Sequence, residues 1–467
     1  MPRLQKRKTF VIVLAVMAIY LVVNFMSPDQ RVQINFDQEP ALQPVLLRTF
    51  APREALLPTT NSSRRSPPEV LGPRAPRQVF APSRGPSSGR LWFMTDGTVR
   101  PQPAPLDTEG NRIASLWPDE SPGDRIIEQL MFVPPDYAEN QPNSTQRLKS
   151  ILLYNGIGNW ASLKPGQDVF LGDNCPVNTC TITTNRDDLP RADAVLFKDH
   201  FLDPNVRRHP DQVWILYLLE CPYHTGAFNF KKTFNWTATY RHDSDIVAPY
   251  EKFVFFDPAV KTLPLQRNYA EGKTLKVAWF VSNCGARNER LKYARQLSRH
   301  IEVDIYGGCG SKSCPRTQHA KCFDMLNKDY KFYLSFENSN CRDYVTEKFF
   351  VNGLGHDIVP IVMGAHKEDY ERAAPPHSFI SVDDFDTPKA LAAYLHTLDA
   401  NDTLYNEYFA WKGTGEFVNT HFWCRMCALL HDKPRPKVYD NIETWWRPPG
   451  ACVTNSWRHP PTHLGSR

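Results

Sequence analysis

Apolar residues occur in short runs through the middle of the chain, and polar or turn residues separate the runs. In the first block the clearest runs are 151–154, 194–197 and 213–217, which are rich in Val, Ile, Leu and aromatic residues. This length and composition are typical of buried β-strands. Residues 249–272 are predicted to form a connector.

A second block alternates strand and helix patterns. Leu291, Ala294, Leu297 and Ile301 recur at helical spacing, which predicts a helix over 287–301. The other elements expected here are strands at 277–281, 303–306, 332–336 and 358–362 and a helix at 343–354. Alternation of this kind predicts parallel sheets, so the two blocks predict an α/β fold with two Rossmann-like domains.

Ligands of such sheets bind beyond the carboxyl ends of the strands, so we expect a nucleotide after residues 281, 306 and 336. One of these places is Gly307–Gly310. It lacks the spacing of a dinucleotide-binding loop and is at least as typical of a tight turn.

The N-terminus carries a membrane-targeting pattern. Basic residues in the segment 1–8 precede the uncharged segment 9–27, which as a helix would span about 28 Å. This order predicts a cytoplasmic tail, a single-pass type II anchor and a lumenal body. A cleaved signal peptide is the alternative, but the run ends at Asn24–Pro28 without a small-x-small site. Because the span is short, we expect a Golgi membrane.

Residues 28–124 are rich in Pro, Ser and Arg and show no apolar periodicity, which predicts a disordered stem. The apolar patch Leu91–Met94 is an exception that we expect to dock on the folded part. Beyond the stem, the expected parts are an N-terminal acceptor-side domain at 125–270, a C-terminal nucleotide-binding domain at 271–431 and an extension at 432–467.

Charge and cysteine content narrow the class of protein. The formal net charge is +5 and most of it lies in the first eight residues, which argues against a nucleic-acid-binding function. All 11 cysteines follow residue 174, as in a lumenal domain with disulfides. Close spacing predicts local bonds within the pairs Cys175–Cys180, Cys309–Cys314 and Cys424–Cys427, with the last as the candidate, and the odd count leaves at least one free thiol. A zinc site is the alternative for Cys-x-x-Cys, but no second such pair exists.

Asn-x-Ser/Thr triplets add weak support for a lumenal location, because such triplets also arise by chance. The candidate glycosylation sites are Asn61, Asn143, Asn235 and Asn401.

The segment 332–348 carries the most informative chemistry. A predicted strand delivers Glu337 and Asn338 to a loop, and the following helix presents Tyr344 and the pair Glu347–Lys348. A carboxylate can hold ribose hydroxyls and a cation can hold a diphosphate, so this mixture suits a nucleotide sugar. Taken alone, an adjacent Glu–Lys pair is more often a solvated helix face.

This segment resembles the donor motif of the α1,3-fucosyltransferase family, Phe-x-Leu-x-Phe-Glu-Asn-Ser followed by Asp-Tyr-x-Thr-Glu-Lys. Similar blocks occur at 235–245, 277–283 and 303–308, and the resemblance spans about residues 124–457. Segments 219–225, 284–288 and 411–417 look like the invertebrate core branch, which fucosylates O3 of the asparagine-linked GlcNAc of N-glycans. The resemblance implies the GT-B fold, in which two Rossmann-like domains face a cleft.

The resemblance also implies residue roles. Glu220, directly after the apolar run 213–219, matches the catalytic carboxylate. Arg290 and Lys348 match the family residues that contact the diphosphate of the donor, GDP-fucose, and Glu347 matches the residue that contacts its ribose. Asn338 and Tyr344 match further positions of the donor site. Less specific candidates are Tyr240, Arg241, Ser244, Asp245 and His224. Cys221 stands where the family often has Ser.

Simple chemistry supports these roles. Two cations can stabilise the leaving diphosphate without an obligatory metal, and a carboxylate can deprotonate the acceptor hydroxyl. A β-linked donor then gives an α-linked product. Mn²⁺ remains a possible stimulant. The Asp-x-Asp pairs at 243–245 and 384–386 are weak signals for a metal site, and Asp384 is expected to start a helix.

Several alternatives remain at this point. They are a Lewis-type enzyme acting on outer GlcNAc, a metal-dependent GT-A transferase, and a membrane-tethered sugar-binding protein with a degenerate site. Partners expected for the first hypothesis are GDP-fucose, N-glycoprotein acceptors and membrane lipid at the anchor. The oligomeric state is left open.

Overall fold

The computed structural model describes residues 89–137, 147–158, 160, 163–315, 317 and 319–458. The anchor expected at 9–27, most of the expected stem, Asn61 and Asn143 lie outside these residues. Within the described ranges, no helix is both long enough and apolar enough to cross a membrane.

The first domain is built on a five-stranded parallel sheet, as the short apolar runs predict. Its strand order is β2-β1-β3-β4-β5. The strands are β1 (Lys149–Leu153), β2 (Cys180–Thr183), β3 (Ala194–Lys198), β4 (Val213–Leu218) and β5 (Trp236–Thr239). The helical segments before and between them are α2 (Ile126–Leu130), η2 (Pro135–Tyr137), α3 (Asp168–Gly172) and η3 (Arg186–Arg191), and η4 (Pro222–His224) follows β4.

The second domain has its own five-stranded parallel sheet, in the order β12-β11-β9-β7-β8. These strands are β7 (Leu275–Phe280), β8 (Val303–Tyr306), β9 (Tyr330–Phe336), β11 (Val359–Met363) and β12 (Ile380–Ser381). Every residue of β9 is buried, as expected for a central strand covered on both faces. The helical segments are α4 (Arg290–Leu297), α5 (His319–Lys328), α6 (Glu347–Phe349), the π-helix Phe350–Leu354, α7 (Lys367–Ala373), η7 (Val382–Asp384), α8 (Pro388–Ala400) and α9 (Asp402–Glu407).

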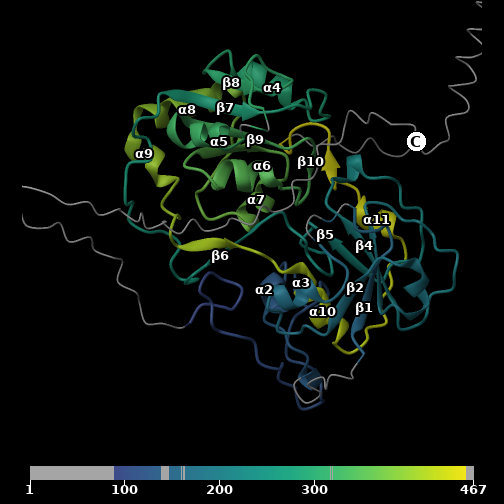
Figure 1. Ribbon diagram of the computed structural model, residues 1–467. Coiled ribbons are helices and arrows are strands. Elements are labelled where there is room, and N and C mark those ends of the chain that lie inside the picture. The colour runs from purple at the N-terminus through teal and green to yellow at the C-terminus, as the bar shows by residue number, and fades with distance from the viewer. Residues whose placement is uncertain are drawn as a thin grey trace, which may run out of the picture. The chain divides into compact units, whose positions relative to one another are not determined.

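The chain then returns to the first domain, which corrects the boundary expected at 431. Helices α10 (Phe422–Leu430) and α11 (Ile442–Trp446), drawn in yellow, appear beside the first sheet and not beside the second (Figure 1). Trp423 and Met426 belong to the core that includes β1 and β3, and Trp446 packs with residues of β4. Residues 422–430 therefore belong to the N-terminal domain.

Two small antiparallel pairs complete the fold. β6 (Lys252–Phe255) pairs with β13 (Gly415–Val418), so the segment expected to be a plain connector contains a strand. β10 (Asn340–Cys341) pairs with β14 (Cys452–Val453). The second pair brings the C-terminal segment to the loop after β9.

Two helix predictions need correction. The helix expected at 343–354 begins only at Glu347, because Asp343 has a φ of 60° and the Thr346 side chain caps α6. Asp384 does not start α8. Thr387 caps that helix instead, and Asp384 forms an ion pair with Lys367.

The disulfides differ from the local bonds that spacing predicts. Cys424 bonds to Cys175 and Cys427 bonds to Cys180, so the expected Cys424–Cys427 and Cys175–Cys180 bonds are wrong. The expected Cys309–Cys314 bond is wrong as well, because these two residues bond to Cys284 and Cys322. Both residues lie on one face of α10, three positions apart, and each meets a cysteine of the first sheet or its loops. The remaining bonds are Cys284–Cys309, Cys314–Cys322 and Cys341–Cys452. All 11 cysteines lie in the described ranges, and Cys221 is the free thiol that the odd count predicts.

The two described glycosylation candidates differ in accessibility. The Asn235 side chain accepts from the Trp214 amide at 2.9 Å and donates to the Lys437 carbonyl at 2.9 Å, and Thr237 of its triplet is fully buried. Asn401 is exposed and caps α9 through its side-chain oxygen. The geometry therefore favours Asn401 over Asn235 as an acceptor.

The folded part begins well before residue 125. Phe93 and Met94 are buried against α2 and β6, so the apolar patch docks as expected. Leu116 and Trp117, placed in the expected stem, are 0% and 1% exposed in the main core of the first domain. The Trp117 ring lies 5.0 Å from that of Trp236. Residues 89–124 are thus part of the fold.

This packing predicts a large stability difference between two residues of one segment. Trp117→Ala removes a fully buried ring and should lower the free energy of unfolding by about 3–5 kcal/mol. Ile113→Ala is the matched control, because Ile113 is 60% exposed and should change stability by less than about 0.5 kcal/mol. Denaturant unfolding of both variants measures the change in the free energy of unfolding. Equal, small effects would show that residues 89–124 do not stabilise the domain.

Candidate active site

Glu220 lies just beyond the carboxyl end of β4, where its position after the apolar run predicts it. The Leu219 carbonyl accepts a hydrogen bond from the Tyr250 hydroxyl at 3.0 Å, which fixes the backbone there. The Glu220 side chain is 40% exposed, and its Oε2 accepts a hydrogen bond from the Tyr344 hydroxyl at 3.1 Å. The carboxylate is therefore open to a ligand and held by a residue of the second domain.

Tyr344 is suited to hold a carboxylate. It is 1% exposed, and its ring lies 5.2 Å from that of Tyr240. Burial, together with the nearby Tyr250 and Glu220, raises the pKa of Tyr344 well above its usual value. The hydroxyl consequently keeps its proton and remains a donor at neutral pH.

The loop after β9 is organised by a buried carboxylate. Glu337 is fully buried and accepts hydrogen bonds from the Thr346 amide at 2.8 Å and from the Thr346 hydroxyl at 2.9 and 2.8 Å. Burial raises the pKa of Glu337 to about 7, although Lys348, 3.5 Å away, opposes the shift. At Gly364 a Cβ would lie 2.6 Å from this side chain, so the position requires glycine.

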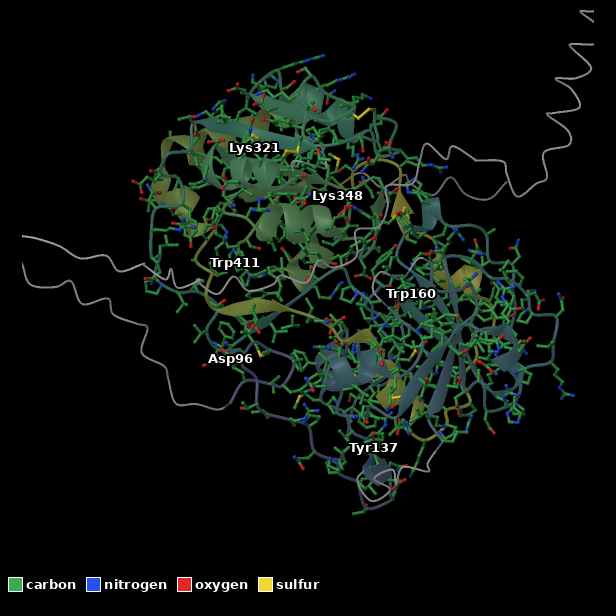
Figure 2. The ribbon with its side chains drawn as sticks, in the orientation of Figure 1. Asp96, Tyr137, Trp160, Lys321, Lys348 and Trp411 are labelled. Atoms are coloured by element: carbon green, nitrogen blue, oxygen red, sulfur yellow. A yellow bond between two sulfur atoms is a disulfide. The ribbon has the colours of Figure 1, made fainter. Side chains whose placement is uncertain are left out.

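The Glu347–Lys348 pair follows directly from this loop. Lys348 lies in the second domain (Figure 2). Its Nζ is 2.9 Å from Glu347 Oε1, and the Lys348 and Glu347 side chains are 12% and 19% exposed. The pair is therefore not the solvated helix face that such a dipeptide usually forms. It is a partly buried cation beside two carboxylates, of which Glu337 is the second.

Carboxylates of both domains affect the pKa of the Tyr250 hydroxyl. Burial raises the pKa of Tyr250 well above its usual value, and the carboxylates of Glu347, Glu220 and Glu337 raise it further. These three carboxylates therefore lie within electrostatic range of a common point. That Glu220 and the Glu–Lys pair share a ligand stays a prediction of the sequence, and the effect of Glu220 and Glu347 on the pKa of Tyr250 is consistent with it.

Arg290 lies at the carboxyl ends of β7 and β9, as expected, but it is 1% exposed. Its Nη1 donates to the Phe336 carbonyl at 2.7 Å and its Nη2 to the Asn283 carbonyl at 3.2 Å. The diphosphate contact remains a prediction. Asn338, 7% exposed, places its Oδ1 4.0 Å from the Cys221 sulfur and so lies against the segment that carries Glu220.

The less specific candidates divide into structural and accessible residues. Arg241 pairs with Asp243 at 2.9 and 2.6 Å, and Asp245 is fully buried and accepts from the Tyr439 hydroxyl at 2.8 Å. Arg241 and Asp245 therefore hold the fold together. His224 remains close to the chemistry, with its Nδ1 3.9 Å from Glu220 Oε2.

The carboxylates of both Asp-x-Asp pairs are engaged by side-chain cations. Asp243 is engaged by Arg241 and Asp245 by Lys437. At the second pair, Asp384 meets Lys367 and Asp386 meets Arg458. Each carboxylate is neutralised by a different side-chain cation, so neither pair presents two free carboxylates to one ion.

A cavity of about 320 Å³ lies at the carboxyl edge of the second sheet, within the size range of ligand pockets. Its polar residues include Asn288, Tyr293, Asn340, Asp383 and Ser456. Burial raises the pKa of Asp383, and Ser456 donates a hydrogen bond to it. Sequence reasoning missed these residues because no local pattern shows that the segment after β14 returns to this sheet.

Comparison with known proteins identifies the family. The model described as "Fucosyltransferase, N-terminal" matches residues 146–251, and "Glycosyltransferase family 10 (fucosyltransferase) C-term" matches residues 270–445. Glycoprotein 3-alpha-L-fucosyltransferase A of Drosophila melanogaster is 53% identical over 386 residues, covering 80% of this chain and 76% of that protein. The chain belongs to the glycosyltransferase family 10 fucosyltransferases.

More distant family members follow. Alpha-(1,3)-fucosyltransferase 7 of Bos taurus is 38% identical over 59% of this chain and 81% of its own length. Alpha-(1,3)-fucosyltransferase C of Drosophila melanogaster is 36% identical, over 62% of this chain and 73% of its own. A crystal structure of an α1,3-fucosyltransferase with GDP-fucose aligns at 17% identity and a TM-score of 0.41, over 64% of this chain and 95% of that one, a likeness too distant to support residue correspondence.

The hydrogen bond between Tyr344 and Glu220 gives a direct prediction for this fucosyltransferase. Tyr344→Phe removes only the donor, so it should lower turnover roughly tenfold while GDP binding is retained. Tyr405→Phe is the matched control, since it removes a buried hydroxyl that donates to the Lys331 carbonyl. Steady-state kinetics and GDP titration measure both. Equal losses of turnover in the two variants would show that the effect comes from general destabilisation and not from the lost hydrogen bond to Glu220.

Glu337 predicts a pH dependence of stability. Its pKa of about 7 lies above the ordinary value of 4.5, so the folded state binds more protons than the unfolded state between these pH values. Unfolding free energy should therefore fall as pH rises from about 4.5 to about 7, by at most about 1.4 kcal/mol per unit from this group.

Glu337→Gln keeps the shape of the side chain and removes its titration. The difference in unfolding free energy between the parent protein and this variant should shrink or reverse with rising pH, most steeply over that interval. Denaturant unfolding at a series of pH values measures it. A difference that stays constant with pH would contradict the assignment of a titrating buried carboxylate.

Proposed function

We propose that this protein is an inverting glycosyltransferase that moves L-fucose from GDP-β-L-fucose to O3 of the asparagine-linked core GlcNAc of N-glycans. The observation that carries the proposal is the hydrogen bond to Glu220 of one domain from the Tyr344 hydroxyl of the other, the domain that also carries the Glu347–Lys348 pair. The 53% identity to a protein named glycoprotein 3-alpha-L-fucosyltransferase A supports the core linkage.

In the proposed reaction Glu220 accepts the proton of the GlcNAc O3 hydroxyl. The oxygen forms a bond to C1 of fucose as the bond from C1 to the diphosphate breaks, and GDP leaves with both electrons of that bond. Attack opposite the β-linked leaving group gives the α-linked product in one displacement. Partial exposure of Glu220 leaves room for the acceptor sugar.

The donor is assigned to the second domain. Lys348 and Arg290 stabilise the negative charge on the departing diphosphate, and Glu347 binds the ribose hydroxyls. The cavity lined by Tyr293 and Asp383 at the edge of the same sheet is the place for the base of the nucleotide. With two cations at the diphosphate, the mechanism requires no step from a metal ion, and Mn²⁺ acts at most as a stimulant.

A Lewis-type reaction on outer GlcNAc is the second candidate. It is favoured by the relatives named alpha-(1,3)-fucosyltransferase, at 36–38% identity. Linkage analysis of the product on one defined N-glycopeptide separates the two reactions. A sugar-binding protein without activity is disfavoured because a lectin has no use for the Lys348 and Arg290 cations.

The cellular setting belongs to the same proposal. Segment 9–27 anchors the protein in the Golgi membrane in type II orientation, and the described domains are lumenal. The five disulfides support a compartment that oxidises thiols, and exposed Asn401 is available for glycosylation there.

Glu220→Gln tests the catalytic assignment. Loss of the general base should reduce turnover of GDP-fucose on a GlcNAc-terminated N-glycopeptide by about 10²–10⁴-fold, with GDP binding unchanged. Glu271→Gln, at an exposed position, is the matched control and should retain full activity. Assays run in EDTA separate this mechanism from a metal-dependent one. Full turnover by the Glu220 variant would remove this residue from the reaction.

A further inference from the structure

A thiol, an imidazole and a carboxylate converge at the end of β4. Cys221 Sγ lies 3.3 Å from His224 Nδ1, and His224 Nδ1 lies 3.9 Å from Glu220 Oε2. The three potential ligand atoms all lie within 4.8 Å of one another. The proposed reaction uses only Glu220, so it leaves the other two groups without a chemical role.

These separations are close to those of a tetrahedral metal site. Zinc binds sulfur at about 2.3 Å and nitrogen or oxygen at about 2.0–2.2 Å, which puts neighbouring ligand atoms about 3.4–3.6 Å apart. The thiol–imidazole distance of 3.3 Å is near this range, and the Glu220 carboxylate oxygen lies within 4.8 Å of both other ligand atoms. Glu220 and His224 are 40% and 33% exposed, whereas Cys221 is fully buried, so an ion would reach the thiol from the side of Glu220 and His224, where a fourth position is left for water.

The turn that presents the ligands is held independently of any ion. The His224 amide donates to the Cys221 carbonyl at 2.9 Å, which closes η4. Arg447, at the end of α11, donates to the Pro222 carbonyl at 3.0 Å and to the Thr225 carbonyl at 2.6 Å. The three ligands therefore come from one short, fixed turn within the first domain and need no domain movement.

The ligand set also selects the ion. Hard cations such as Mg²⁺ and Mn²⁺ prefer oxygen ligands, whereas a thiolate and an imidazole favour Zn²⁺. Among the described cysteines, Cys221 is the one with a sulfur that is not in a disulfide. The other two clusters of this kind, which include Cys180 with Cys427 and Cys424, use sulfurs already bonded as disulfides.

We propose that Glu220, Cys221 and His224 form a binding site for Zn²⁺ and that Zn²⁺ bound there reversibly inhibits fucosyl transfer. On binding, the thiol proton is released to solvent and the sulfur electron pair is given to the metal. The metal also takes the Glu220 electron pair that would accept the proton of the acceptor hydroxyl. Inhibition rests on the proposed function; binding does not.

The binding test uses full-length, untagged protein that has been stripped of metal with EDTA and dialysed. Titration with ZnCl₂ should show one site per chain with proton release, and Co²⁺ should give thiolate-to-metal absorption. Cys221→Ser should lower Zn²⁺ affinity by more than about 100-fold. Substitution of a residue that only supports a ligand typically lowers metal affinity by about 10–100-fold, so a larger loss indicates that the sulfur itself binds the metal. His209→Gln is the matched control, because His209 is an exposed histidine 3.8 Å from Asp211, and it should leave the site intact.

The activity test compares each protein with and without Zn²⁺, so that changes in basal rate cancel. Zn²⁺ should inhibit the parent protein and His209→Gln at the concentration that fills the site, Cys221→Ser should resist, and Mg²⁺ should not inhibit. Equal Zn²⁺ affinity in the parent protein and Cys221→Ser would overturn the site, and undiminished turnover with the site full would overturn the proposed inhibition. Cysteine-dependent binding by a protein without fucosyltransferase activity would refute the proposed function and leave the site standing.

Discussion

A buried tyrosine hydroxyl, that of Tyr344, connects the two domains at the place assigned to the reaction. It comes from the second domain and donates to Glu220 of the first. Because Tyr344 is almost fully buried, it cannot ionise readily and remains a donor. Tyr344 thus orients the partly exposed carboxylate of Glu220 through a hydrogen bond from a neutral donor, which brings no opposite charge to it. The rest of the site is arranged around this contact.

The loop that carries Tyr344 depends in turn on Glu337. Burying a carboxylate is unfavourable, and here Thr346 and Lys348 offset part of that cost. The same interactions set the start of α6, so that Glu347 and Lys348 project from a defined first turn. Gly364 leaves the space that this arrangement needs. A partly charged loop is therefore held at the end of β9, a strand in which every residue is buried.

Much of the fold could be predicted from local patterns. Buried parallel strands such as β4 and β9 appear as continuous apolar runs, and the residues after them, Glu220 and Glu337, mark the functional edge. The Cys424–Cys427 bond was predicted wrongly because spacing reports nearness along the chain, whereas α10 packs across the first sheet. The packing of Trp117 was also missed, since its surroundings in sequence are rich in proline and polar residues.

The sequence also did not show the roles of residues whose contacts are distant along the chain. Nothing near Asp245 in the sequence shows that Tyr439 and Lys437 bind it, so a structural carboxylate resembled a site residue. Conversely, Asp383 and Ser456 meet only because β14 brings the end of the chain back to the second sheet. The roles of Asp245, Asp383 and Ser456 depend on long-range pairing, which the periodicity of the sequence does not encode.

The most direct test of the central claim is a crystal structure of the protein with GDP and an N-glycan core acceptor. The account predicts that O3 of the asparagine-linked GlcNAc lies within hydrogen-bonding distance of Glu220 and that the diphosphate contacts Lys348 and Arg290. An acceptor whose O3 lies away from Glu220, or a diphosphate bound far from both cations, would contradict it.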